Sequence, residues 1–305
     1  MGGLKKKFNI TYRKHNQLRD WIIILGIFVG TVLIFRLAKF YEDRSFFVLS
    51  ADSFLALHIL LEFLAIVMAF CVFAVTYYTS GQTKSMSMLI IACTFLSVTL
   101  LDTMHTFSYK GMPLFLSPSS PEKATTLWIG SRLVMAVGML IASLIPYSKK
   151  IKGNQGVYVA INVTLTMLLI GLIIYRPNIF PAMHIEGGGL TPLKISLEYI
   201  ISAILIITAV IYHKHYIKSN RDKAYILLVV GLVIGGLGEM SFTMYNNVYD
   251  TYNLLGHFYK FLAHYLLFHA LFVINIKKPY KDLREAEKKL NNYVDDLERS
   301  VELRT

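Results

Sequence analysis

Long apolar runs recur along the chain and are separated by short polar segments. Each run is about 20 residues or longer, which is the helix length needed to cross a hydrocarbon core of about 30 Å. The pattern predicts about eight membrane-spanning helices. Their expected ranges are 20–40, 51–78, 86–108, 124–147, 156–175, 194–213, 224–245 and 253–275. We therefore expect an all-α fold, a polytopic membrane helix bundle.

The C-terminal segment has a different pattern. Residues 281–305 are rich in charged, helix-favouring residues, and their apolar positions alternate at spacings of four and three. Those positions are Leu290, Val294, Leu297 and Val301, with Leu283 one heptad earlier. This spacing is typical of a parallel coiled coil and predicts a homodimer through residues 283–305. The alternative is an amphipathic helix lying on the inner membrane surface. Because the chain ends while this helix is still running, we expect something to follow it.

Composition supports a membrane protein. The chain is 55% hydrophobic and only 16% charged, whereas a soluble domain carries roughly 25% charged residues. The net charge of +12 comes from Lys and Arg concentrated in segments on one side of the predicted spans. That asymmetry follows the positive-inside rule and predicts a multi-pass membrane protein with both termini in the cytoplasm. It favours contact with anionic membrane lipids and argues against nucleic-acid binding.

Three segments follow from these patterns. We expect a basic cytoplasmic arm over residues 1–19, a transmembrane domain over 20–276, and a cytoplasmic linker or signalling helix over 280–305. This division places the short coiled coil directly after the last membrane span.

Ionisable residues interrupt several of the apolar spans, where a charge costs several kcal/mol unless it is paired or hydrated. They are His58, Glu62, Asp102, His105, Arg132, Glu198, Glu239, His257, Lys260 and His264. Those on one helix share a face because they are mostly three or four residues apart. Nearly all fall in the outer half of the bundle, which predicts a built site. We expect Glu198 and Lys260 to be partly hydrated, and Glu239, on a stripe with Gly231 and Gly235, to face protein.

The charges in this set do not balance. Four carboxylates against Arg132 and Lys260 leave a formal charge of −2 with neutral histidines. A divalent zinc, manganese or iron ion would compensate it. The expected metal ligands are His58, Glu62, Asp102, His105 and His257. The other expected cofactor-binding residues are Arg132, Glu239, Lys260 and His264.

The same polar set is also compatible with a haem site, a brace between helices or a ligand cavity. Two of the histidines His58, His105, His257 and His264 would be able to ligate a haem b from different helices. In a brace, some carboxylates would be protonated, or Arg132 would clamp Asp102 and Glu62 together. A cavity would be polar or filled with water.

Catalytic signatures are absent from the sequence. It contains no G-x-x-x-x-G-K-[ST], G-x-S-x-G, H-E-x-x-H or C-x-x-C motif. We therefore expect no enzymatic activity in this region. Two rival functions are a membrane enzyme with a His/carboxylate metal centre and an ion or proton transporter. The inner halves of the spans nearly lack charge, which argues against a polar path across the membrane.

Four sequence stretches carry a family resemblance. They are Leu101–Met112 (LDTMHTFSYKGM), Leu127–Arg132 (LWIGSR), His58-x-x-x-Glu62 and Gly256–Lys260 (GHFYK). They resemble the bacterial membrane-associated sensor domain of type three. The resemblance implies an N-terminal sensory module of histidine kinases, diguanylate cyclases and related signalling proteins, including two-component systems.

The tail is consistent with that resemblance. Residues 297–305 are similar to the linker helix that leads into such output domains. Together with the outer position of the ionisable residues, the resemblance predicts a receptor that detects a ligand or cofactor state at an outer-leaflet site. The last span would transmit this state to a cytoplasmic output domain or partner, where any kinase or cyclase activity would lie.

Overall fold

The computed structural model describes residues 25–26, 29–34, 36–37, 50–218, 223–245 and 249–303. Within these residues, seven helices are long and apolar enough to cross a membrane. They are α2 (Ala51–Thr83), α3 (Met86–Ser108), α4 (Pro121–Leu144), α5 (Gln155–Tyr175), α6 (Pro192–Lys218), α7 (Lys223–Ser241) and α8 (Thr251–Phe272). The predicted all-α polytopic bundle is confirmed for this part of the chain. The predicted span over 20–40 lies largely outside the described residues.

Local sequence determines where the helices begin. α4 starts directly after a loop that contains Pro113 and Pro118. Its cap is Ser120, whose hydroxyl accepts a hydrogen bond from the Lys123 N–H, and Pro121 occupies the first turn. α8 starts in the same way, with Asp250 accepting from the Tyr252 N–H at 2.6 Å. Both caps satisfy backbone donors that a helix leaves unpaired at its start.

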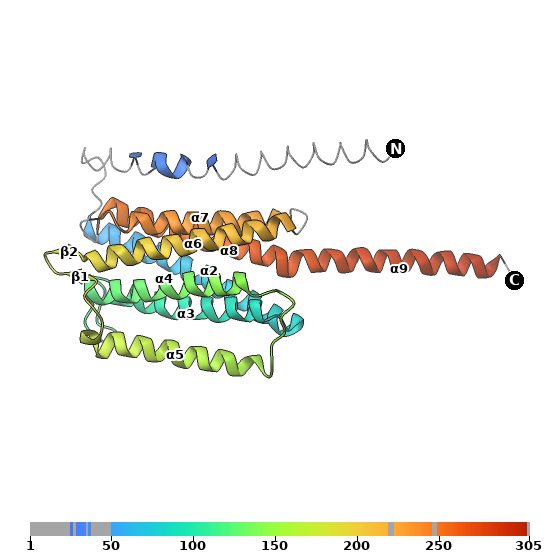
Figure 1. Cartoon of the computed structure of the whole chain (residues 1–305), viewed down its shortest axis with the longest axis horizontal. Coiled ribbons are helices and arrows are strands. Elements are labelled where there is room, and N and C mark those ends of the chain that lie inside the picture. Colours follow the sequence, from blue (N-terminus) through green and yellow to red (C-terminus); the bar gives the residue numbers. More distant parts are fainter. Residues whose placement is uncertain are drawn as a thin grey trace.

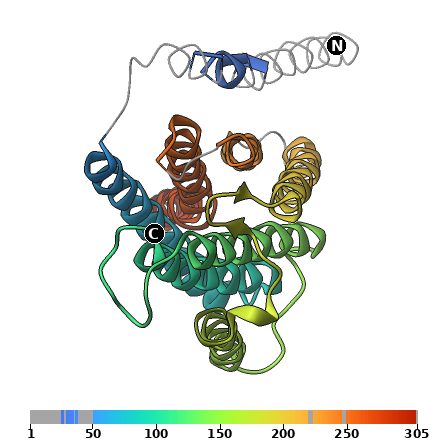
Figure 2. The ribbon, with the colours of Figure 1, turned by 90° about the vertical axis from the view of Figure 1, so that its left-hand side faces the viewer.

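Six of the helices form a closed ring. Going round it, α2 packs on α3, α3 on α4, α4 on α6, α6 on α7, α7 on α8, and α8 returns to α2. α5 lies outside the ring against α3 and α4 (Figures 1 and 2). The sequence explains this difference, because α5 carries no charged residue whereas each ring helix carries at least one in the buried interior. A helix without ionisable groups can face lipid on most sides.

Small residues bring α7 close to α8. A Cβ atom placed at Gly231 would lie 3.3 Å from the backbone oxygen of Ala263, and one at Gly238 would lie 2.9 Å from Cβ of Tyr259. This close approach turns the adjacent Glu239 into the bundle, where it is 4% exposed. The prediction that Glu239 faces protein is therefore confirmed.

The last span continues into the C-terminal helix without a break. α8 is followed directly by a π-helical turn, η2 (Val273–Lys277), and by α9 (Lys278–Glu302) (Figure 1). Pro279 lacks an N–H, and in a regular α-helix its ring would press on the carbonyl of Asn275. The widened turn just before the proline accommodates that ring, so the chain stays helical. α9 has no buried residue among those described.

Two connections at the end of the bundle opposite α9, those from α3 to α4 and from α5 to α6, are longer than the others. The segment between α5 and α6 forms a short 3₁₀ turn, η1 (Pro177–Ile179), and a small antiparallel hairpin of β1 (His184–Ile185) and β2 (Gly189–Leu190). Glu122 at the start of α4 holds this hairpin by accepting hydrogen bonds from the backbone N–H groups of Met183 and His184. The hairpin therefore covers the end of the bundle opposite α9.

Candidate functional site: a buried ring of charged and histidine side chains

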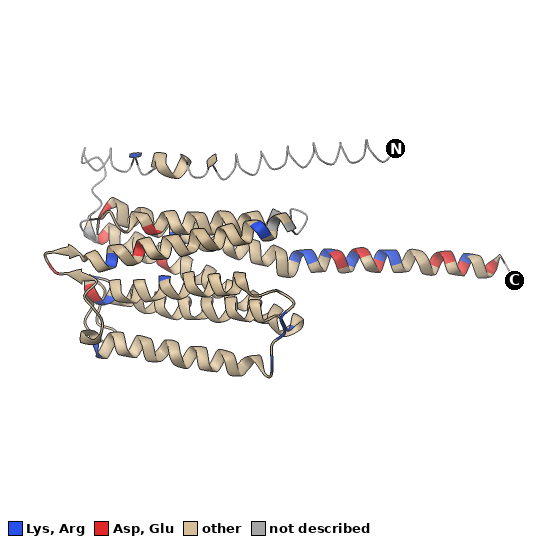
Figure 3. Cartoon of the chain, viewed as in Figure 1, with Lys and Arg blue, Asp and Glu red and all other residues tan. Residues whose placement is uncertain are grey.

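All the ionisable residues predicted from the spans meet inside the six-helix ring. Each is at most 5% exposed. They are His58 and Glu62 from α2, Asp102 and His105 from α3, Arg132 from α4, Glu198 from α6, Glu239 from α7, and His257, Lys260 and His264 from α8. Most charged residues of the bundle helices lie toward the end opposite α9, whereas α9 alternates both signs of charge (Figure 3). The predicted hydration of Glu198 and Lys260 is wrong, because they are 0% and 5% exposed.

Glu62 joins α2 to α8. Its Oε1 lies 2.7 Å from Nδ1 of His257, and Nζ of Lys260 donates to both of its oxygens, at 2.9 Å and 2.6 Å. Thr106 Oγ1 on α3 lies 3.5 Å from Oε2. A carboxylate removed from water needs such charged and hydrogen-bonding partners. Glu62 therefore links α2 to both α3 and α8.

Asp102 is the second anchor of the ring. Arg132 Nη2 contacts both of its oxygens, at 2.6 Å and 2.8 Å, and Lys260 Nζ lies 2.9 Å from Oδ2. One alternative from the sequence was a clamp of Arg132 on both Asp102 and Glu62, and Arg132 contacts Asp102 only. Lys260 lies between the two carboxylates and neutralises Glu62 instead. His264 lies beside this pair, with Nε2 at 3.5 Å from Arg132 Nη1.

A third polar group joins α6, α4 and α7. Glu198 Oε1 accepts from Lys194 Nζ at 2.9 Å and from the Trp128 indole N–H at 3.1 Å. The Glu239 carboxyl lies near that of Glu198 and adds a second buried negative group. The residues expected in the interior from the sequence did not include Lys194. Its spacing of four residues before Glu198 is the signal that would have identified the pair.

Lys194 changes the charge balance of the interior. It is 1% exposed, with its ammonium 5.0 Å from the centre of the Tyr245 ring and bonded to the Phe242 carbonyl. Four carboxylates now face three cations, so the formal charge is −1 rather than −2. A proton on either Glu198 or Glu239 would bring the formal charge to zero, because two buried carboxyl groups near each other disfavour a charge on both. One proton is therefore enough for charge neutrality, and a divalent ion is not required.

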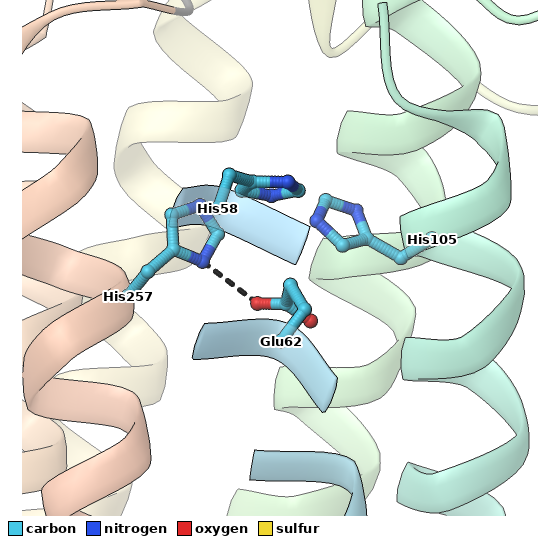
Figure 4. Close-up of side chains that lie close together, drawn as sticks. All are labelled: His58, Glu62, His105 and His257. Carbon is cyan, nitrogen blue, oxygen red and sulfur yellow. Dashed lines mark hydrogen bonds and ion pairs between the residues drawn. The ribbon is translucent and has the colours of Figure 1, made fainter. Parts of the chain in front are cut away.

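Three histidines come together next to Glu62. One ligand atom from each of His58, Glu62, His105 and His257 lies within 4.8 Å of the others (Figure 4). Asp102, also expected among the metal ligands, is not in this group, because Arg132 and Lys260 hold it. The rings of His58 and His257 have centres 4.4 Å apart, and that of His105 lies 5.8 Å and 6.2 Å from them.

The ring nitrogens of these histidines are not all used. Nδ1 of His105 lies 2.7 Å from the Ala124 carbonyl, which only accepts, so Nδ1 carries the proton. Nε2 of His105 has no partner, and neither nitrogen of His58 has one. Buried polar atoms are normally hydrogen-bonded. Unpartnered, unprotonated imidazole nitrogens of this kind can bind a metal ion.

Two cavities lie on the side of the histidines away from α9. The smaller has a volume of about 20 Å³ and is lined by His105, Trp128 and His257, among others. The larger, about 450 Å³, lies under the β1–β2 hairpin. Lys110, Pro121 and Tyr245 line both cavities, so the two cavities are neighbours. The smaller has room for about one water molecule.

Comparison with known families agrees with the resemblance seen in the sequence. The sequence pattern of the membrane-associated sensor domain (MASE3) matches residues 49–279, which include every ring helix and all of the buried cluster. Neither a curated protein sequence nor a solved protein structure gave a match. The matched region covers most of the chain, and its helices are those of a multi-pass membrane protein. The chain therefore belongs to the membrane-associated sensor domain family.

Proposed function

We propose that the chain senses a ligand at the buried cluster and reports it through the position of α9. One observation carries this proposal: His257 and Lys260, which hold Glu62, are on the helix that continues through η2 into α9. A helix is stiff along its axis, so a shift of α8 at the cluster moves the helix that leaves the bundle. The membrane bundle and α9 then need no enzymatic activity of their own.

A sensor needs two arrangements of its helices. Here they would differ in whether the contact between Glu62 and His257 is made or broken. A ligand that replaces the contact between Glu62 and His257 weakens the attachment of α8 to α2. A ligand that strengthens this contact has the opposite effect. In either case, the ligand must favour one arrangement by a few kcal/mol to shift the populations substantially.

The orientation follows from the distribution of basic residues. We propose that α9 lies in the cytoplasm of a bacterial cell and that the cluster lies in the outer half of the inner membrane. Basic residues at the inner ends of the helices would contact anionic lipids. The larger cavity under the hairpin would then open toward the outer side and admit the ligand.

The output would be read from paired α9 helices. The apolar positions of α9 form one stripe, and all are exposed in the single chain: Leu283, Leu290, Val294, Leu297 and Val301. Pairing of two chains through this stripe buries it in a coiled coil. A rotation or shift of α8 changes how the two α9 helices meet, and a cytoplasmic output domain or partner responds to that change.

A reporter fusion tests this function. The chain is joined at its C-terminus to an enzyme whose activity depends on the alignment of two paired helices. We expect His257→Gln and Glu62→Gln to change the reporter activity at least several-fold, because each breaks the contact between α2 and α8. His269→Gln is the matched control, since His269 is on α8 but exposed outside the cluster. Equal reporter activity in all three variants and in the parent would refute the proposal.

A further inference from the structure

We propose that His58, His105 and His257 bind one first-row transition-metal ion, with Glu62 orienting His257 and a fourth coordination position facing the small cavity. This inference rests on the proposed function, because it names the chemical class of the ligand at the same cluster. It is narrower than the expectation from sequence, since three imidazoles from three helices replace a mixed set of histidines and carboxylates.

The spacing of the three rings fits a single ion. Imidazole nitrogens bind zinc at about 2.0–2.1 Å, so the ring centres of imidazoles placed tetrahedrally round one ion lie about 5 Å apart. The observed separations of the ring centres are 4.4, 5.8 and 6.2 Å. These separations lie on both sides of the ~5 Å expected for a shared ion, so small side-chain movements would bring all three rings to one ion.

The hydrogen bonds behind two of the rings are those of metal-binding histidines. A ligating histidine usually donates its second N–H to a carbonyl or carboxylate, which fixes the ring and its tautomer. Nδ1 of His105 contacts the Ala124 carbonyl at 2.7 Å, and Nδ1 of His257 contacts Glu62 Oε1 at 2.7 Å. In both residues Nε2 is then the nitrogen that remains for the ion.

His58 provides the strongest sign that a ligand belongs here. It is 0% exposed, and neither ring nitrogen has a hydrogen-bonding partner. The ring is held by stacking on Tyr109, with centres 3.8 Å apart, and by the edge of His257. A buried imidazole with no polar partner is unfavourable. An ion shared with His105 and His257 would satisfy one of its nitrogens.

Glu62 acts better as an orienting group than as a ligand. Both of its oxygens are already used, Oε1 by His257 and Lys260 and Oε2 by Lys260. A metal bound by three neutral imidazoles leaves one tetrahedral position open. The cavity of about 20 Å³ that touches His105 and His257 can hold a water molecule or a small anion at that position. Because the charges of the interior already balance without the metal, an anion there would offset part of the positive charge that the ion brings.

The donor atoms select the class of ion. Neutral imidazoles suit zinc, copper, iron and nickel, whereas magnesium and calcium prefer oxygen ligands. Zinc accepts a tetrahedral site with three histidines and one open position. We therefore use Zn²⁺ as the binding probe and Co²⁺ as its spectroscopic substitute.

The test uses the full chain purified in detergent and stripped of metal with a chelator. We expect one Co²⁺ per chain, visible-absorption bands typical of a four-coordinate site with nitrogen ligands, and displacement by Zn²⁺ but not by Mg²⁺. His58→Gln, His105→Gln and His257→Gln should each weaken Co²⁺ binding at least tenfold. Thermal unfolding in the absence of metal checks that each variant is folded.

A control variant separates the site from general effects. His269→Gln removes an exposed histidine of the same helix that lies outside the group of three. It should bind Co²⁺ as the parent chain does. Absence of the absorption bands in the parent, or their retention in all three ligand variants, would overturn the inference.

The metal inference and the proposed function can fail separately. If the reporter fusion responds to His257→Gln and Glu62→Gln but the parent chain binds no Co²⁺, the sensor proposal holds and the metal inference is refuted. If the parent chain binds Co²⁺ through the three histidines but the reporter ignores every variant, the metal site holds and the sensor proposal is refuted.

Discussion

Lys260 Nζ lies 2.6 Å from Glu62 Oε2, and this contact joins α8 to α2 across 198 positions of the sequence. Both side chains are almost fully buried. Removing one partner of a buried ion pair leaves an uncompensated charge, whereas removing both is much less harmful. The stability of the ring should therefore depend on keeping such pairs complete.

The first prediction concerns Lys260. Lys260→Met leaves the carboxylates of Glu62 and Asp102 short of one cation, so we expect a loss of about 3–5 kcal/mol of unfolding free energy. The double variant Lys260→Met/Glu62→Gln should recover part of this loss. Denaturant unfolding in detergent measures both. A single variant as stable as the parent chain would contradict the pairing.

The second prediction concerns Lys194. Lys194→Met removes the only cation bonded to Glu198 among the described residues and leaves the carboxylate with the Trp128 indole, so we again expect a loss of about 3–5 kcal/mol. Lys110→Met is the control, because Lys110 is exposed and exposed substitutions usually change stability by about 0.5 kcal/mol or less. Similar melting temperatures for the two variants would show that Lys194 is not part of the interior.

The third prediction compares two glycines of α4. A Cβ at Gly138 would lie 2.9 Å from Cβ of Thr94 on α3 and closer still to its other side-chain atoms, whereas a Cβ at Gly130 would meet nothing within 4 Å. Gly138→Ala should thus destabilise the chain by about 1–3 kcal/mol through overpacking. Gly130→Ala should be neutral or stabilising by up to about 1 kcal/mol, since alanine favours helix. The reverse order of melting temperatures would disprove this packing of α3 on α4.

The fourth prediction concerns pairing through α9. Leu290→Gln combined with Leu297→Gln places polar groups in the apolar stripe and should abolish dimer formation. Asn292→Gln changes an exposed residue outside the stripe and should leave the dimer intact. Cross-linking in native membranes measures the dimer fraction. An undiminished dimer in the first variant would exclude the coiled coil.

The sequence predicted the described helices well, because length and apolar composition reflect the thickness of a bilayer. It also predicted that the ionisable residues share one interior, since a charge facing lipid is costly. Helix ends were less accurate: α2 continues to Thr83 beyond the expected residue 78, and α6 begins at Pro192 rather than 194. Polar residues at the ends of a span continue the helix into water, so hydropathy does not mark where it stops.

The sequence did not predict which individual side chains pair. One alternative had Arg132 holding both Asp102 and Glu62, but the order of helices round the ring places Lys260 between the two carboxylates. The order of the helices depends on which helix faces pack against each other, and the spacing of residues along one helix does not reveal it. Lys194 was missed for a related reason, because the Phe242 carbonyl and the Tyr245 ring, which follow α7, contact its ammonium group.

The central claim is that binding at the three histidines moves α9 relative to the bundle. The most direct measurement is the distance between two spin labels in one chain, at Lys152→Cys in the connection between α4 and α5 and at Asn292→Cys in α9. The native Cys71 and Cys93 are replaced by alanine, and labelled chains are diluted with unlabelled ones. We predict that Zn²⁺ shifts the distance distribution in this chain and not in one that also carries His257→Gln. Identical distributions with and without Zn²⁺ in a chain that binds the ion would contradict the claim.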